Sequence, residues 1–279
     1  MDILVQAIVM GLVQGLTEFL PVSSSGHLIL VPALLGWDDP FIGSLAFSVM
    51  LHLGTLLALL VYFRADWLRL IPAGFASIRE RSIGGDPDRR LVWLLAASTI
   101  PAVVAGVLLH DLFESAQFRT ATLVAMTLVI GAAILWLAER LATRTRGIGD
   151  LNFKAAAGIG VAQALALVPG ISRSGISISA GLYYGLDRAS AARYSFLMAT
   201  PITAGAGLFE LRKLMTGQAG VDVALGPLIA GMIAALVAGL LAIAGLLRFL
   251  QTNPTTVFVV YRLALAAVVV AWWLGLADR

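Results

Sequence analysis

The stretch Gln14-Gly-Leu-Thr-Glu-Phe-Leu-Pro-Val-Ser-Ser-Ser-Gly-His27 decides how this chain folds. It places an amide, a carboxylic acid, three serine hydroxyls and an imidazole within fourteen residues, and apolar sequence lies on both sides. Polar and ionisable groups are expensive to bury in lipid, and they mark functional sites there. We therefore expect this stretch to interrupt a membrane helix and to contribute to a site.

The composition indicates an integral membrane protein. Of the 279 residues, 59% are hydrophobic and 13% are charged, whereas soluble domains carry about 25% charged residues. The mean hydropathy is +0.93. The net charge of +3 comes from arginines in the predicted loops, as the positive-inside rule expects, so we predict no nucleic-acid partner. The chain has no cysteine, which excludes disulfides and thiolate chemistry.

Two regions, 3–36 and 155–186, begin as apolar helices, break at Pro and Gly in a serine-rich segment, and then resume. Irregular backbone at membrane depth is tolerated only inside protein or beside a wet cavity. We therefore predict two re-entrant helical hairpins within an all-α polytopic membrane protein that forms a single membrane domain, 1–279. Six further segments are predicted to span the membrane, at about 20 residues each: 41–63, 91–110, 120–138, the shorter 195–209, 225–247 and 257–275.

An internal repeat relates the two hairpins. Seven residues of the first hairpin recur as the same type 149 positions later. The pairs are Gly11 and Gly160, Gln14 and Gln163, Ser23 and Ser172, Ser25 and Ser174, Gly26 and Gly175, Gly36 and Gly185, and Asp38 and Asp187. We predict one repeat over about 1–138 and a second over about 155–279.

The charge of the linkers predicts that this repeat is inverted. Linkers 64–90 and 139–154 are rich in arginine, whereas loop 111–119 has one arginine and two acids, so the first two are predicted to be cytoplasmic. The first hairpin then opens from outside and the second from inside, and both termini lie outside. Inverted repeats with broken helices place their site near the midplane, where the repeats meet. The basic pair Arg212 and Lys213, which this scheme puts outside, argues against it.

The two copies differ in the residues that could carry chemistry. The second hairpin has Arg173 where the first has Ser24, and it has apolar residues where the first has Glu18 and His27. The planar guanidinium of arginine suits phosphate oxygens, and helix N-termini also attract anions. We therefore predict a phosphate site, which is built from Arg173, Ser172, Ser174, Ser23, Ser25 and the backbone of Gly26.

The first hairpin then supplies the reactive groups. Ser24 could be a nucleophile with His27 as its base, since a serine hydroxyl alone is a weak nucleophile. Glu18 could orient the imidazole or bind a divalent cation, and Gln14 lies one helical turn before it, on the same face. Alternatively, the serine run only caps the broken helix. For His52 we favour a structural role, and the roles of Arg262 and Glu210 stay open.

At these residues the chain resembles a known family. Gln14-x-x-x-Glu18 with Pro21-Val-Ser-Ser-Ser-Gly-His27 is similar to the (E/Q)xxxE and PVSSxGH signatures of bacterial undecaprenyl-pyrophosphate phosphatases of the bacitracin-resistance type. Pro169-Gly-Ile-Ser-Arg-Ser-Gly175 is similar to that family's second signature. The resemblance runs through nearly the whole chain, with further similar blocks at Leu51-His-Leu-Gly-Thr-Leu56, Tyr194-Ser-Phe-Leu-Met-Ala-Thr-Pro201 and Tyr261-Arg262.

The resemblance implies an enzyme of the bacterial plasma (inner) membrane that removes the terminal phosphate of undecaprenyl pyrophosphate. The product lipid is reused in peptidoglycan synthesis. By motif position, Ser24 would be the nucleophile, His27 the base, Glu18 the essential acid and Arg173 the phosphate ligand. The resemblance also implies a divalent cation, Mg²⁺ or Ca²⁺, a homodimer, and a site reached from the outer face.

Two departures and one alternative accompany this interpretation. Many family members have Glu at the position of Gln14, and many have an acid at the position of Ser48; both changes remove negative charge from the expected site. The alternative function is a lipid-phosphate flippase or transporter, because inverted repeats around a midplane site are transporter architecture. The sequence leaves open whether Ser24 forms a phosphoseryl intermediate or only positions water.

Overall fold

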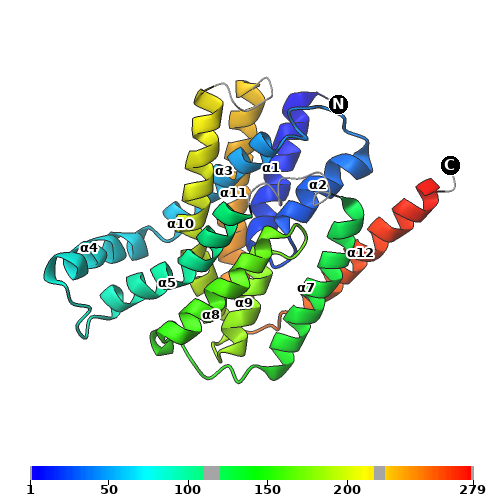
Figure 1. Cartoon of the computed structure of the whole chain (residues 1–279). Coiled ribbons are helices and arrows are strands. Elements are labelled where there is room, and N and C mark those ends of the chain that lie inside the picture. Colours follow the sequence, from blue (N-terminus) through cyan, green and yellow to red (C-terminus); the bar gives the residue numbers. More distant parts are fainter. Residues whose placement is uncertain (1, 110–119, 217–223, 278–279) are drawn as a thin grey trace.

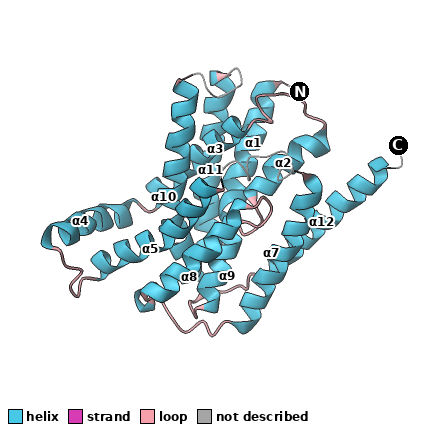
Figure 2. Cartoon of the chain, viewed as in Figure 1, coloured by secondary structure: helices cyan, strands magenta, loops and turns pink. Residues whose placement is uncertain are grey.

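The computed structural model describes residues 2–109, 120–216 and 224–277, and in these ranges the chain is helical, without strands (Figures 1 and 2). The all-α prediction is confirmed. The predicted loop 111–119 lies outside the described residues. The described α-helices are α1 (Ile3–Phe19), α2 (Ser24–Leu35), α3 (Leu45–Tyr62), α4 (Arg64–Glu80), α5 (Pro87–Leu108), α7 (Ala121–Leu141), α8 (Phe153–Ala164), α9 (Arg173–Tyr183), α10 (Arg188–Met215), α11 (Leu225–Phe249) and α12 (Thr256–Ala277).

Five described helices, α3, α5, α7, α11 and α12, are long and apolar enough to cross a membrane. They match five of the six predicted spans, which makes the chain a multi-pass membrane protein. The sixth predicted span, 195–209, forms the middle of α10, which is longer than expected at 28 residues. This helix falls outside the five because Ser, Thr and Gly lower the hydropathy of its centre and charged residues occupy both ends.

The segment 64–90, expected to be a linker, is largely helical. It contains α4, whose exposed apolar side chains recur at helical spacing, three or four residues apart. These side chains are Leu68, Ile71, Phe75 and Ile78. Arg69 lies within this stripe, and the other arginines of the segment lie before or after it. These charges hide the helical period of the stripe from a search for apolar runs.

The two predicted hairpins are present as broken helices, α1 with α2 and α8 with α9. Their open ends point toward opposite ends of the bundle, and their turns lie near its centre (Figure 1). The second helix of each pair begins after a serine with positive φ, 75° at Ser23 and 73° at Ser172. Each serine Oγ accepts the N–H three residues ahead, that of Gly26 or Gly175.

The two breaks therefore share one local geometry at positions related by the offset of 149. A side chain in this region of φ is strained, and such strain persists where the surroundings impose it, often at functional sites.

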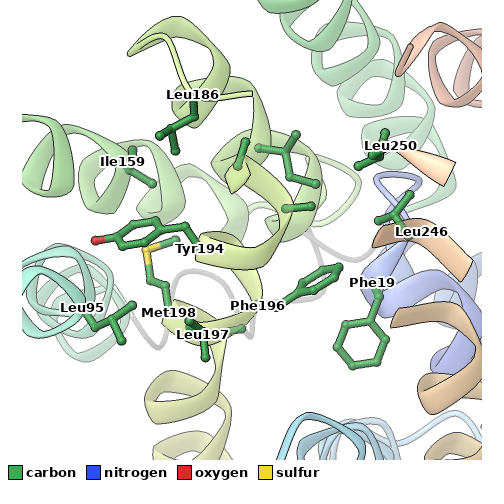
Figure 3. Close-up of a cluster of buried hydrophobic side chains, with 14 of the residues drawn as sticks. Phe19, Leu95, Ile159, Leu186, Tyr194, Phe196, Leu197, Met198, Leu246 and Leu250 are labelled. Atoms are coloured by element: carbon green, nitrogen blue, oxygen red, sulfur yellow. The ribbon is translucent and has the colours of Figure 1, made fainter. Parts of the chain in front are cut away.

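Close packing around the end of α1 fixes the position of the first break. Phe19 is fully buried, and its ring meets the edge of Phe196 at 5.3 Å between centroids. Figure 3 shows this pair within a cluster of buried side chains from α1, α5, α8, α10 and α11. Since Phe19 follows Glu18 directly, its burial also fixes where the carboxylate lies.

Candidate active site

A cavity of about 210 Å³ lies where the two hairpin turns meet. Both hairpins, α3 and α10 contribute polar residues to its wall: Glu18, Ser24, Ser25, His52, Gln163, Ser172, Arg173 and Thr203. The turns are joined directly, because Ser174 Oγ donates to the Leu20 carbonyl at 2.9 Å. The prediction that the site combines the two hairpins agrees with this geometry.

Glu18 is the centre of the polar wall, and it is 6% exposed. Its Oε1 accepts a hydrogen bond from Arg173 Nη2 at 2.6 Å. Its Oε2 accepts from the Ser24 hydroxyl and from Gln14 Nε2, the latter at 3.1 Å. His52 Nε2 lies 3.5 Å from the same oxygen. A buried charge needs such partners to offset the loss of hydration, and here one carboxylate joins the predicted acid, hydroxyl and guanidinium.

Arg173 is the first residue of α9 and keeps part of its guanidinium free. Nη2 binds Glu18, whereas Nη1 is buried and makes no hydrogen bond within the described part of the chain. A buried donor without a partner is unusual and calls for an explanation. At a cavity wall, beside the N-terminus of a helix, an anion would satisfy it.

His27 does not pair with Ser24. Its Nδ1 lies 2.7 Å from the Ser23 carbonyl, which can only accept, so Nδ1 donates. Nε2 lies 2.7 Å from the hydroxyl of Tyr261, and the two rings are nearly parallel. Both nitrogens therefore have partners other than Ser24, whose hydroxyl donates to Glu18. The three-residue spacing suggested a nucleophile and its base, but the imidazole turns toward α12.

Several predicted phosphate ligands stabilise the turns instead. The Gly26 N–H is satisfied by Ser23 Oγ, and Ser174 uses its hydroxyl on Leu20. Gly26, Ser23 and Ser174 do not contribute to the cavity wall, whereas Ser25 and Ser172 do. The serine run thus has both of the roles considered above, with capping at Ser23 and exposure to the cavity at Ser24 and Ser25.

Three residues outside the predicted set contribute to the cavity or to the turn beside it. His52, for which we favoured a structural role, lines the cavity beside Glu18. Gln163, noted only as the repeat partner of Gln14, also lines it. Arg262 is completely buried, and its Nη2 donates to the carbonyls of Gly170 and Ile171 at 2.8 and 2.7 Å. The sequence already marks His52 and Arg262 as candidate functional residues, because both are ionisable groups in apolar helices.

The oxygen atoms around Glu18 suit a hard divalent cation. Gln14 is fully buried, and its Oε1 has no hydrogen-bond partner within the described ranges. Among the residues that the structure describes, no three His, Cys, Asp or Glu side chains form a group that could hold a metal by themselves. Mg²⁺ is usually bound by one or two carboxylates together with substrate phosphates. The donor set of Glu18, Gln14 and the Ser24 hydroxyl fits a cation that binds with an anionic substrate.

Known proteins match this chain along most of its length. The model of the family described as bacitracin resistance protein BacA matches residues 7–268. Three relatives, each named undecaprenyl-diphosphatase, come from Desulforudis audaxviator, Gemmatimonas aurantiaca and Moorella thermoacetica. Their sequences are 44%, 46% and 44% identical to this chain over 95%, 95% and 96% of its length. The matches cover 96%, 96% and 98% of the relatives. The chain therefore belongs to the bacitracin resistance protein BacA family.

Proposed function

We propose that this protein hydrolyses undecaprenyl pyrophosphate to undecaprenyl phosphate and inorganic phosphate in the cavity between the hairpins. The observation that carries the proposal is the contact of Glu18 with both Ser24 and Arg173. A hydroxyl beside a carboxylate and a guanidinium with a free N–H are the parts that phosphoryl transfer requires. The relatives' shared name favours hydrolysis over transport. The reaction would recycle the lipid carrier for cell-wall synthesis and confer bacitracin resistance, as the family's name suggests.

Ser24 Oγ attacks the terminal phosphorus of the pyrophosphate, and its proton passes to Glu18 Oε2. The bond from that phosphorus to the bridging oxygen breaks, and the lipid monophosphate leaves. Water then attacks the phosphoseryl phosphorus, and its protons leave with the released phosphate. The Oγ–P bond breaks, and Glu18 returns its proton to Ser24 Oγ. The hydrogen bond from Ser24 to Glu18 supports the carboxylate as the proton acceptor. His27 would position the turn through the Ser23 carbonyl.

The charge of the cavity explains why a cation would be needed. Arg173 is largely neutralised by Glu18, so a pyrophosphate with several negative charges meets little net positive charge. Mg²⁺ or Ca²⁺ would be held by Glu18 and Gln14 Oε1 together with the substrate. The bound cation would neutralise the charge that develops on the phosphate oxygens.

The remaining wall of the cavity suits a lipid. Small and apolar side chains from α3, α5, α10 and the turn after α8 line it: Val49, Ala102, Ala166, Leu167, Ile202 and Ala206. We infer that the prenyl chain leaves the cavity along these residues and enters the bilayer. The protein would act in the bacterial inner membrane with its site open to the outer face, which the arginine-rich linkers also favour. It would act as a homodimer, as the resemblance implies.

Phosphate release from undecaprenyl pyrophosphate by the purified protein in detergent tests the proposal. Ser24→Ala and Arg173→Ala should each lower the rate by at least a hundredfold, since each removes a group that acts on the transferred phosphate. Gln251→Leu, at an exposed turn, is the control and should keep the rate. Wild-type rates in either site variant would refute the assignment. If Ser24→Ala still moves labelled lipid phosphate across liposomes, the transporter alternative gains support.

A further inference from the structure

Gln163 is the second feature of the cavity whose polar atoms lack a partner. It lies in the last turn of α8, before the break that precedes α9, and it is 2% exposed. Neither its Nε2 nor its Oε1 makes a hydrogen bond within the described ranges, although the residue lines the cavity. Burying an amide without a partner costs free energy. A ligand in the cavity would remove that cost.

The repeat explains why this amide is free. Gln14, its counterpart in the first hairpin, donates from Nε2 to Glu18, four residues ahead on the same helical face. In the second hairpin the position four residues ahead of Gln163 is Leu167, which cannot accept a hydrogen bond. The side-chain N–H donor of this residue type thus has a partner in the first repeat and none within the described ranges in the second, whereas the side-chain oxygen is unpartnered in both.

The neighbouring groups determine what kind of ligand would fit. Gln163 shares the cavity wall with Arg173, whose Nη1 is also buried and unpartnered, and with the hydroxyls of Ser25 and Ser172. These groups can all donate hydrogen bonds, and the one carboxylate of the wall, Glu18, is already bound to Arg173, Ser24 and Gln14. A cluster of donors with one cation selects an anion with several acceptor oxygens.

We propose that Gln163 Nε2 and Arg173 Nη1 together bind phosphoryl oxygens of the diphosphate, so that Gln163 is a substrate-binding residue contributed by the inverted repeat. This inference rests on the proposed function, because it takes the ligand to be the diphosphate of the lipid substrate. It adds a residue that the signature motifs do not contain. Arg173 thereby holds Glu18 with one nitrogen and the substrate with the other.

Two variants separate donation from acceptance and from mere space filling. Gln163→Leu keeps the size of the side chain but removes the N–H, and Gln163→Glu keeps the shape but replaces the N–H with an anionic oxygen. A hydrogen bond to a charged group corresponds to about a tenfold to hundredfold change in affinity. We expect Gln163→Leu to raise the KM for undecaprenyl pyrophosphate at least tenfold, with a smaller change in kcat. Gln163→Glu should raise it further, since its charge repels phosphate.

Binding of inorganic pyrophosphate, measured by calorimetry on the detergent-solubilised protein, gives a readout that needs no turnover. The Kd should rise at least tenfold in Gln163→Leu and stay unchanged in the control Gln251→Leu. The thermal midpoint of Gln163→Leu should equal or exceed that of the wild type, because an unsatisfied amide is removed. If this variant does not fold, Gln163→Met, with an unbranched chain of similar length, replaces it.

The outcomes separate the two proposals. If the wild type hydrolyses the lipid and binds pyrophosphate, but Gln163→Leu matches it in both KM and Kd, the role of Gln163 is refuted while the proposed function stands. A gain of affinity in Gln163→Glu would refute donation by the amide. If the wild type hydrolyses no lipid, the proposed function fails, and the pyrophosphate Kd still decides whether Gln163 binds a diphosphate.

Discussion

At the scale of single residues, Glu18 has more assigned partners than any other side chain of the cavity wall. One of its oxygens binds Arg173, and the other accepts from Ser24 and Gln14. This arrangement makes Glu18, and not His27, the group beside the hydroxyl. The assignment of the proton acceptor therefore depends on comparing these two residues.

We expect Glu18→Gln to lower kcat by about a hundredfold to ten-thousandfold, the range typical of a lost general base. His27→Gln should lower it by about tenfold or less, because the imidazole contacts Ser23 and Tyr261 instead of the nucleophile. Steady-state rates of phosphate release measure both. A larger loss in His27→Gln than in Glu18→Gln would restore the histidine as the base. Size-exclusion profiles of both variants control for misfolding.

The motifs predicted the acid, the hydroxyl and the arginine, because their spacing within each hairpin limits where they can lie. They could not predict the partner of His27, since Tyr261 is 234 positions away in the chain. Sequence spacing also does not show which way a side chain turns on the first turn of a helix. The role of Gln163 required knowing that its amide has no partner, which depends on the whole cavity.

At the scale of elements, the close approach of α1 and α11 positions the first hairpin. Gly15 lies three residues before Glu18, and a Cβ there would come within 2.5 Å of the Ala235 carbonyl oxygen. Small residues let membrane helices pack this closely. The glycines of α1 therefore determine how far the carboxylate lies from α11.

Gly15→Ala should destabilise the protein by about 1–3 kcal/mol, the usual cost of overpacking, and should lower activity by displacing Glu18. Gly245→Ala is the matched control, because this helical glycine of α11 is exposed and has no atom near the added methyl. It should change stability by less than about 1 kcal/mol. Thermal unfolding in one detergent compares the two variants. Equal midpoints would mean that α1 and α11 can separate without cost.

Elements were predictable where one physical signal dominated. Pro, Gly and Ser at 20–26 and 168–175 predicted the two broken helices, because these residues interrupt an apolar helix. Helix α4 escaped prediction because charged residues lie within and beside its apolar stripe, so its mean hydropathy is low. The length of α10 was underestimated for the same reason, since charged residues extend the helix beyond its apolar centre.

At the scale of the whole molecule, the charges brought together from both repeats nearly cancel in the cavity. We therefore expect removal of divalent cations with EDTA to lower phosphate release at least tenfold, and added Mg²⁺ or Ca²⁺ to restore it. The thermal midpoint without substrate should change little, because the described residues contain no cluster of three acidic or histidine ligands. Full activity in EDTA would show that Arg173 and its neighbours suffice.

Helix topology also connects the cavity to one side of the membrane. The arginines of linkers 64–90 and 139–154 predict that these segments are cytoplasmic. The first hairpin, whose open end is at the opposite end of the bundle (Figure 1), would then open outward. Arg212 and Lys213, near the end of α10, instead favour a cytoplasmic position for that end of the helix. The two assignments place residue 216 on different sides of the membrane, so its accessibility decides between them.

Because the chain has no cysteine, a single introduced cysteine is the one site in this protein that a maleimide can label, and its labelling reports the orientation. Gly85→Cys and Gly149→Cys lie in the two linkers, where an added side chain meets no neighbour, and Thr216→Cys is exposed at the other end. In intact cells whose outer membrane is made permeable, a membrane-impermeant maleimide should label Thr216→Cys alone. Detergent should then expose all three. Labelling of the linker cysteines before detergent, with Thr216→Cys protected, would show that the membrane orientation is the opposite of the predicted one. The cavity would then face the cytoplasm, and the enzyme would act on lipid pyrophosphate made inside the cell instead of lipid released outside it.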